Sequence, residues 1–104
     1  GLIIGSAFHR IPAVVDGFIS GAAALVAVSL KSAIREYLFA GHRSAEQGHR
    51  IVLEWLGLDP LLDLSMRLGE GTGAALGMFI IESGIRVLRE VLTFDEAGVK
   101  KAIR

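Results

Sequence analysis

The sequence contains no cysteine, only two prolines and 7% aromatic residues. Without cysteine, disulfide frameworks, thiol catalysis and cysteine zinc sites are excluded. The 11 basic and 11 acidic side chains cancel, so the chain has no formal net charge at neutral pH. A general nucleic-acid binder needs a basic face to displace counterions from phosphates, and this composition argues against that class of protein.

Long hydrophobic runs are also missing. The longest apolar stretch, residues 17–30, is interrupted by Ser20, Gly21 and Ser29. A membrane-spanning helix needs about 20 apolar residues, so this stretch is too short. No basic-then-apolar leader with a cleavage site is seen. We therefore expect buried helices in a soluble, cytoplasmic protein that does not contact a membrane.

The composition is that of a folded domain. Hydrophobic residues make up 52% and charged residues 21% of the 104 residues, which excludes intrinsic disorder and fits one domain. The chain starts with Gly1-Leu2-Ile3-Ile4-Gly5, without an initiator methionine or a polar lead-in. We therefore expect a piece of a longer chain, cut inside a structural element.

Two strand-then-helix units follow one another. Residues 11–16 are β-branched and apolar on both faces, which is typical of a buried parallel strand, and an alanine-rich helix is predicted over 18–30. Residues 36–41 are the second strand candidate, and a helix follows at about 45–56. The pattern predicts an open, mostly parallel α/β sheet with flanking helices, a Rossmann-like three-layer arrangement.

The second helix has clear end signals. Ser44 is a candidate N-cap with Gln47 completing a capping box, while Gly57 and Pro60 end the helix. A helix N-terminus at the carboxyl end of a strand favours a phosphate, to which His42 and Arg43 could add positive charge. The alternative is that Ser44 is only a helix cap.

The remaining segments are less regular. Residues 61–68 are apolar with Asp63 and Arg67 at ion-pair spacing, and a long helix is predicted over 74–92. We expect residues 93–104 to be a frayed polar end. Trp55 and the stripe of the long helix are expected in the core; that stripe comprises Ile81, Ile85, Leu88 and Leu92.

Gly69-Glu70-Gly71-Thr72-Gly73 is the most unusual feature of the sequence. Alternating glycines let a backbone approach a ligand closely or adopt positive φ, so Glu70 could be a general base in a glycine-lined pocket. The alternative is a flexible turn with a solvated glutamate. Asp16, at the end of a strand, could orient a substrate or a catalytic partner, or could cap the helix beginning at Gly17.

The three histidines do not indicate a metal site. His9, His42 and His49 lie on different predicted elements and lack the i,i+4 spacing of a helical zinc pair. We interpret them as surface histidines or as residues behind the site, and we expect neither a metal nor an organic cofactor.

Three motifs together carry a family resemblance. Asp16-Gly17-Phe18-Ile19-Ser20, the run from Tyr37 to Glu46 and the run from Asp63 to Leu76 occur in this order. The set resembles the C-terminal part of the nicotinate-nucleotide–dimethylbenzimidazole phosphoribosyltransferase family. The end from Thr93 to Val99 is similar to that family's end. The resemblance makes 1–104 a single segment, with strand–helix units at about 11–58, an active-site loop at 61–73 and a helix at 74–92 assignable to a small helical domain.

The resemblance implies a reaction in cobalamin lower-ligand synthesis. The phosphoribosyl group of nicotinate mononucleotide moves to 5,6-dimethylbenzimidazole, which gives α-ribazole 5′-phosphate and nicotinate. Glu70 matches the family's catalytic base. Asp16, Ser44 and the backbone of Leu68 are placed at the substrate site, with Ser44 near the phosphate. The resemblance further implies a homodimer whose sites draw on both subunits.

Two features separate this chain from the family pattern. Gln47 stands where the family has proline, and the family enzyme is much longer, with most of the benzimidazole pocket and a second functional glutamate N-terminal to this segment. A non-catalytic remnant or interaction module that keeps the motifs is therefore the alternative function. The intact Glu70 between its glycines favours the transferase.

Overall fold

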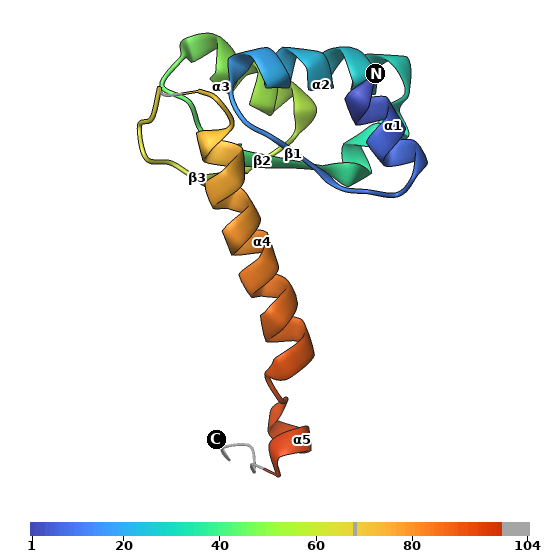
Figure 1. Ribbon diagram of the computed structural model, residues 1–104, viewed down its shortest axis with the longest axis vertical. Coiled ribbons are helices and arrows are strands. Elements are labelled where there is room, and N and C mark those ends of the chain that lie inside the picture. The colour runs from blue at the N-terminus through green and yellow to red at the C-terminus, as the bar shows by residue number, and fades with distance from the viewer. Residues whose placement is uncertain (68, 99–104) are drawn as a thin grey trace.

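The computed structural model describes residues 1–67 and 69–98. Helices and strands alternate through most of this range (Figure 1). In chain order the elements are α1 (Leu2–Phe8), β1 (Ala13–Val15), α2 (Phe18–Leu30), the 3-10 helix η1 (Ser32–Tyr37), β2 (Leu38–His42), α3 (Gln47–Leu56), β3 (Pro60–Leu62), α4 (Thr72–Glu90) and α5 (Phe94–Ala97).

The strands form a small parallel sheet in the order β1-β2-β3. Val14 of β1 is in register with Phe39 of β2, and His42 of β2 is in register with Leu62 of β3. Helices α2 and α3 cover one face of this sheet, and α4 leaves from the other (Figure 1). The structure thus confirms the predicted α/β class with parallel strands and flanking helices.

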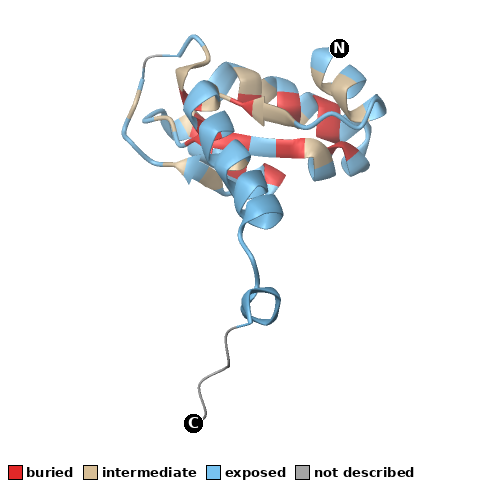
Figure 2. Ribbon diagram, turned by 60° about the horizontal axis from the view of Figure 1, so that its bottom comes forward, coloured by how far each residue is buried: buried red, intermediate tan, exposed pale blue. Residues whose placement is uncertain are grey.

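The core lies between the sheet and the α2–α3 pair (Figure 2). Helix α2 contributes mainly small side chains, which let it approach its neighbours closely. Burying these apolar side chains stabilises the fold by about 25 cal/mol per Å². The buried members are Val15, Ala24, Ala27, Val28, Ile34, Leu38, Ala40, Leu53 and Leu56.

The end of α3 forms as the sequence predicts. Gly57 is left-handed, with φ of 68°, and its N–H donates to the carbonyl of Glu54 at 3.1 Å. Leu58 N–H donates to the carbonyl of Leu53 at 3.1 Å, and the Leu58 side chain packs against the core. These bonds satisfy carbonyls that the helix end would otherwise leave unpaired.

Several boundaries differ from the sequence prediction. The first strand is shorter than predicted, at Ala13–Val15, and the second is shifted to Leu38–His42 because Ser32–Tyr37 forms a 3-10 helix. Pro60–Leu62 is a third strand where an apolar segment with an internal ion pair was expected. Asp63 lies 3.8 Å from the Arg43 guanidinium, so the expected pairing with Arg67 is wrong.

The predicted long helix forms as α4, but its apolar stripe is not core. Leu88 is 86% exposed, and Trp55 of α3, also expected in the core, is 52% exposed. Helix α4 extends beyond the sheet, where most of its apolar side chains are exposed among the described residues (Figure 2). The frayed end is also wrong in part, since Phe94–Ala97 forms a short helix capped by Thr93. Within the described ranges, every helix is too short or too polar to cross a bilayer.

Helix α4 docks on β2 through glycines. A Cβ built at Gly41 of β2 would lie 2.7 Å from the carbonyl oxygen of Gly73, and one built at Gly77 would lie 2.9 Å from the Gly41 Cα. A Cβ at Gly73 would overlap the His42 imidazole. The backbones of helix and strand therefore meet with no side chain between them, and this contact fixes where α4 begins.

We expect Gly77→Ala to destabilise the protein by about 1–3 kcal/mol, because the added methyl group meets backbone atoms that cannot rotate away. Gly84→Ala on the same helix is the matched control, since no described atom lies within 4 Å of a Cβ built there. That control should raise stability by up to about 1 kcal/mol through helix propensity. Denaturant unfolding of both variants checks this, and equal effects would contradict the close docking.

Candidate functional site

A cleft of about 430 Å³ opens at the carboxyl ends of β1 and β2. Parallel α/β sheets commonly bind ligands at this edge. Segments far apart in the sequence meet there: the end of β1, the start of α2, the end of β2 and the glycine-rich loop before α4. The lining residues are Asp16, Gly17, Phe18, Ile19, Ser20, His42, Glu46, Arg67, Gly69, Glu70 and Gly71.

Asp16 joins the first strand to the last long helix. Its Oδ2 accepts a hydrogen bond from Gly71 N–H at 3.2 Å, and its Oδ1 accepts one from Ala74 N–H at 3.0 Å. The carboxylate thus caps the N-terminus of α4, where free amides and the helix dipole favour a negative charge. Of the two readings of Asp16, capping of α2 is wrong, because Ser20 Oγ accepts from Gly17 N–H at 3.0 Å and serves that helix instead.

Glu70 stands exposed on the wall of this cleft. Three successive residues are left-handed, with φ of 68° at Gly69, 57° at Glu70 and 79° at Gly71. Glycine adopts this conformation freely, whereas a glutamate does so at a cost of about 1–3 kcal/mol. The hydrogen bond from Gly71 to Asp16 anchors the backbone of this turn next to Glu70.

Ser44 is not the N-cap of α3, and the predicted capping box with Gln47 is wrong. The helix begins at Gln47 with Glu46 as its N-cap residue. Ser44 Oγ instead accepts a hydrogen bond from Glu46 N–H at 3.3 Å, and Ser44 N–H donates to His49 Nδ1 at 3.0 Å. The loop before α3 is therefore shaped by a buried histidine one turn into the helix.

Two buried histidines lie at the cleft: His42 lines it, and His49 lies next to His42. His49 is fully buried and His42 is 3% exposed, with their ring centroids 6.1 Å apart. His42 Nδ1 lies 3.7 Å from Asp16 Oδ1. The described residues contain no group of three or more potential metal ligands. Of the site residues expected from the sequence, Asp16 and Glu70 share the cleft.

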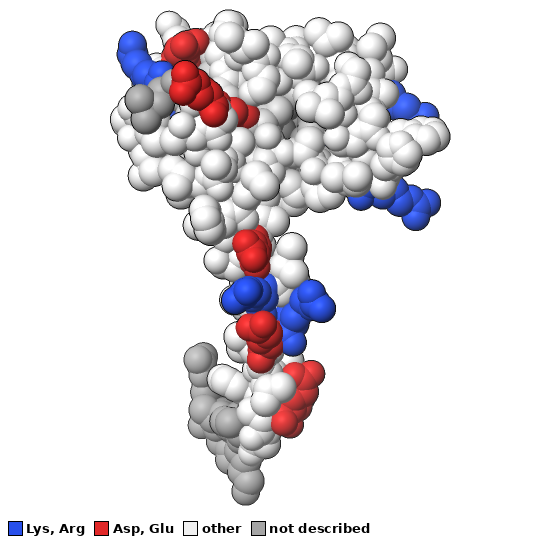
Figure 3. All heavy atoms as spheres, viewed as in Figure 1, with Lys and Arg blue, Asp and Glu red and all other residues white. Residues whose placement is uncertain are grey.

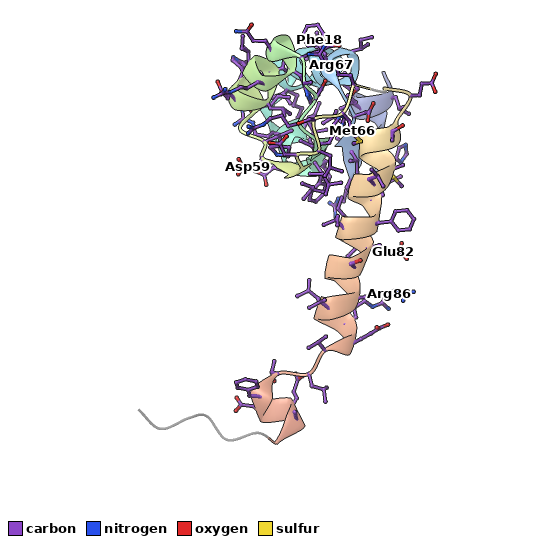
Figure 4. All side chains as sticks on the ribbon, turned by 90° about the vertical axis from the view of Figure 1, so that its left-hand side faces the viewer. Phe18, Asp59, Met66, Arg67, Glu82 and Arg86 are labelled. Atoms are coloured by element: carbon purple, nitrogen blue, oxygen red, sulfur yellow. The ribbon has the colours of Figure 1, made fainter. Side chains whose placement is uncertain are left out.

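The sequence prediction missed Arg67, a charged residue that lines the cleft. Arg67 and Phe18 both line the cleft, and both lie at the end of the globular part farthest from Arg86 (Figure 4). Arg43, expected to add positive charge at this site, lies in the ion pair with Asp63 instead. Leu68 falls outside the described residues. Arg67 could have been found as the one cation next to the glycine-rich motif.

Elsewhere the visible face of the globular part carries few charged side chains, whereas acidic and basic side chains alternate along α4 (Figure 3). The cleft therefore differs from its surroundings in charge. Asp16, Glu46 and Glu70 bring carboxylates to it and Arg67 brings a guanidinium.

Burial lowers the pKa of His49 below its ordinary value of 6.5, and the neighbouring His42 lowers it further, against smaller opposing effects of Asp16 and Glu46. The unfolded chain therefore binds a proton at higher pH than the folded one. We expect the free energy of unfolding to fall as the pH drops from about 6.5 toward the pKa of His49 in the folded protein. The His49→Gln variant should lose less of this free energy over the same interval. Thermal unfolding followed from about pH 7.5 down to about pH 5.5 measures both. A His49 ring that titrates above 6.5 by NMR would contradict the account.

The sequence and the fold both match known proteins. The family described as phosphoribosyltransferase matches residues 1–99. Nicotinate-nucleotide–dimethylbenzimidazole phosphoribosyltransferase of Desulforamulus reducens is 63% identical over 97% of this chain, and that of Geobacter metallireducens is 58% identical over 97%. The chain spans 29% of the length of each of these curated relatives.

A solved structure gives the same result. The crystal structure of the phosphoribosyltransferase of this name from Thermus thermophilus superposes with a TM-score of 0.93 at 47% identity. The match covers 98% of this chain and 31% of that protein. On the family match, the relatives and the shared fold, the chain belongs to the nicotinate-nucleotide–dimethylbenzimidazole phosphoribosyltransferase family.

Proposed function

We propose that the full-length protein transfers the phosphoribosyl group of nicotinate mononucleotide to 5,6-dimethylbenzimidazole. The products are α-ribazole 5′-phosphate and nicotinate, and the reaction serves cobalamin lower-ligand synthesis. The relatives' printed names supply the two substrates. The observation that carries the proposal is the placement of Glu70, which a strained and anchored loop holds at the wall of an open cleft.

In the proposed reaction Glu70 is the general base. A neutral benzimidazole is a weak nucleophile until its N–H proton leaves. Glu70 accepts that proton while the other ring nitrogen attacks the anomeric carbon, and the bond to the nicotinate nitrogen breaks with its electron pair going to nicotinate. Attack from the face opposite the leaving group inverts the carbon from β to α. A positioned base contributes about 10²–10⁴-fold to such a step.

Three further residues have supporting roles in this proposal. Asp16 holds the loop that bears Glu70, and the family resemblance implies that the backbone of Leu68, which lies outside the described residues, contributes to the substrate site. Ser44 lies in the turn that leads into α3, whose N-terminus favours the nucleotide phosphate. The Ser44 and Glu46 amides already donate hydrogen bonds within this turn, so we propose that the phosphate binds near Ser44 at the first turn of α3.

The proposed enzyme needs more than this chain. The exposed apolar side chains of α4 require a cover, which the N-terminal part of the full-length protein and a second subunit would provide. We propose a homodimer because the family resemblance implies one. The remaining walls of the benzimidazole pocket would come from the part of the relatives that this chain does not span.

Glu70→Gln in the full-length enzyme should lower kcat by about 10²–10⁴-fold, with the KM of nicotinate mononucleotide nearly unchanged, because glutamine keeps the size but cannot accept the proton. Glu82→Gln is the control, since Glu82 is exposed on α4 away from the cleft (Figure 4). Steady-state nicotinate release measures both. A Glu70→Gln enzyme within about tenfold of normal kcat would limit Glu70 to orienting the substrate, because one hydrogen bond is worth roughly 1 kcal/mol.

The 104-residue chain by itself should show little or no transfer, although the full-length protein is active. Much of the rate of a two-substrate reaction comes from holding both substrates in line, which an incomplete pocket cannot do. The same nicotinate-release assay, run on both proteins at equal concentration, checks this. Turnover by the short chain close to that of its parent would show that the whole pocket lies within these residues.

A further inference from the structure

We propose that His42 is a positioning residue for Glu70, acting through Asp16. The inference rests on the proposed function. It adds to the proposed site a residue other than the general base Glu70. His42 ends β2, is 3% exposed, and lies against the start of α4 where only a glycine at position 73 leaves room for its ring. It is therefore built into the contact between the sheet and α4.

The imidazole faces the carboxylate that caps α4. His42 Nδ1 lies 3.7 Å from Asp16 Oδ1, and among the described residues it has no hydrogen-bond partner. Asp16 Oδ1 already accepts from Ala74 N–H at 3.0 Å and has a second lone pair. A hydrogen on Nδ1 attracts this carboxylate, whereas a bare Nδ1 would set two lone pairs against each other. The surroundings thus assign the Nδ1–H tautomer.

A separation of 3.7 Å is longer than a hydrogen bond, so His42 contributes an N–H dipole directed at a charge. His42 is buried and Asp16 is half-buried, which strengthens this attraction relative to water. His42 therefore keeps Asp16 in the orientation that accepts from Gly71 and Ala74 at the same time.

The effect reaches Glu70 through one residue of backbone. Gly71 N–H, which donates to Asp16 Oδ2, directly follows Glu70, and Glu70 has a left-handed φ of 57°. If Asp16 turns, the loop loses the bond that holds this unfavourable conformation, and Glu70 leaves its place at the cleft. His42 thus acts on catalysis by orientation and not by moving a proton of the substrate.

The test uses His42→Leu and His42→Asn in the full-length enzyme, with the exposed His9→Leu as control. Leucine fills space without a donor, whereas asparagine places an N–H near the Nδ1 position. We expect His42→Leu to lower kcat about 10–100-fold with the KM of nicotinate mononucleotide within about threefold, as for a base displaced by about 1 Å. His42→Asn should recover most of the loss. Equal loss in both variants, or full kcat in His42→Leu, would overturn the inference.

Two measurements do not depend on turnover. Amide hydrogen exchange of residues 69–74 should quicken in His42→Leu and not in His42→Asn or His9→Leu; faster exchange over the whole chain would show a merely structural role. Ring-nitrogen NMR of the unmodified, isotope-labelled enzyme should show hydrogen on His42 Nδ1, and the opposite tautomer would overturn the inference even if His42→Leu does not fold. An enzyme that is inactive on nicotinate mononucleotide would refute the proposed function. Hydrogen exchange and ring-nitrogen NMR would still test the role of His42 in that case.

Discussion

The carboxylate of Asp16 is the interaction on which the arrangement of the site depends. It reaches from the end of the first strand to the amides of Gly71 and Ala74, more than fifty residues later in the chain. One side chain thereby ends the glycine-rich loop, begins α4 and joins both to the sheet. A buried or half-buried carboxylate is stable there because two N–H groups and the helix dipole replace the water that it loses.

The cap works only because the backbone of α4 comes close to the sheet. Gly41 faces Gly73 and Gly77 with no room for a side chain, so α4 starts within reach of Asp16. The same closeness confines His42 between strand and helix. The close packing of α4, the Asp16 cap and the strained loop therefore depend on one another, and together they position the proposed base at the cleft.

The sequence predicted what local chemistry decides. Strand-then-helix order, the Gly57 helix end and the unusual loop around Glu70 follow from residue type and spacing, and the family resemblance is confirmed. The partner of Asp16 could not be predicted, because a carboxylate after a strand can cap the next helix or a distant one, and only the fold decides between them. For the same reason the ion pair of Asp63 with Arg43 was missed. Trp55 and the α4 stripe were misplaced because periodicity shows that a face is apolar but not which part of the protein covers it.

The central claim is that the anchored loop presents Glu70 to the nucleophile. A crystal structure of the full-length enzyme with 5,6-dimethylbenzimidazole and a non-reactive analogue of nicotinate mononucleotide tests it most directly. The account predicts a Glu70 carboxylate oxygen within about 2.6–3.2 Å of a benzimidazole ring nitrogen. It also predicts that Gly71 N–H is still bonded to Asp16. A Glu70 side chain turned to solvent, with the benzimidazole nitrogen bonded to another residue of an otherwise ordered site, would contradict it.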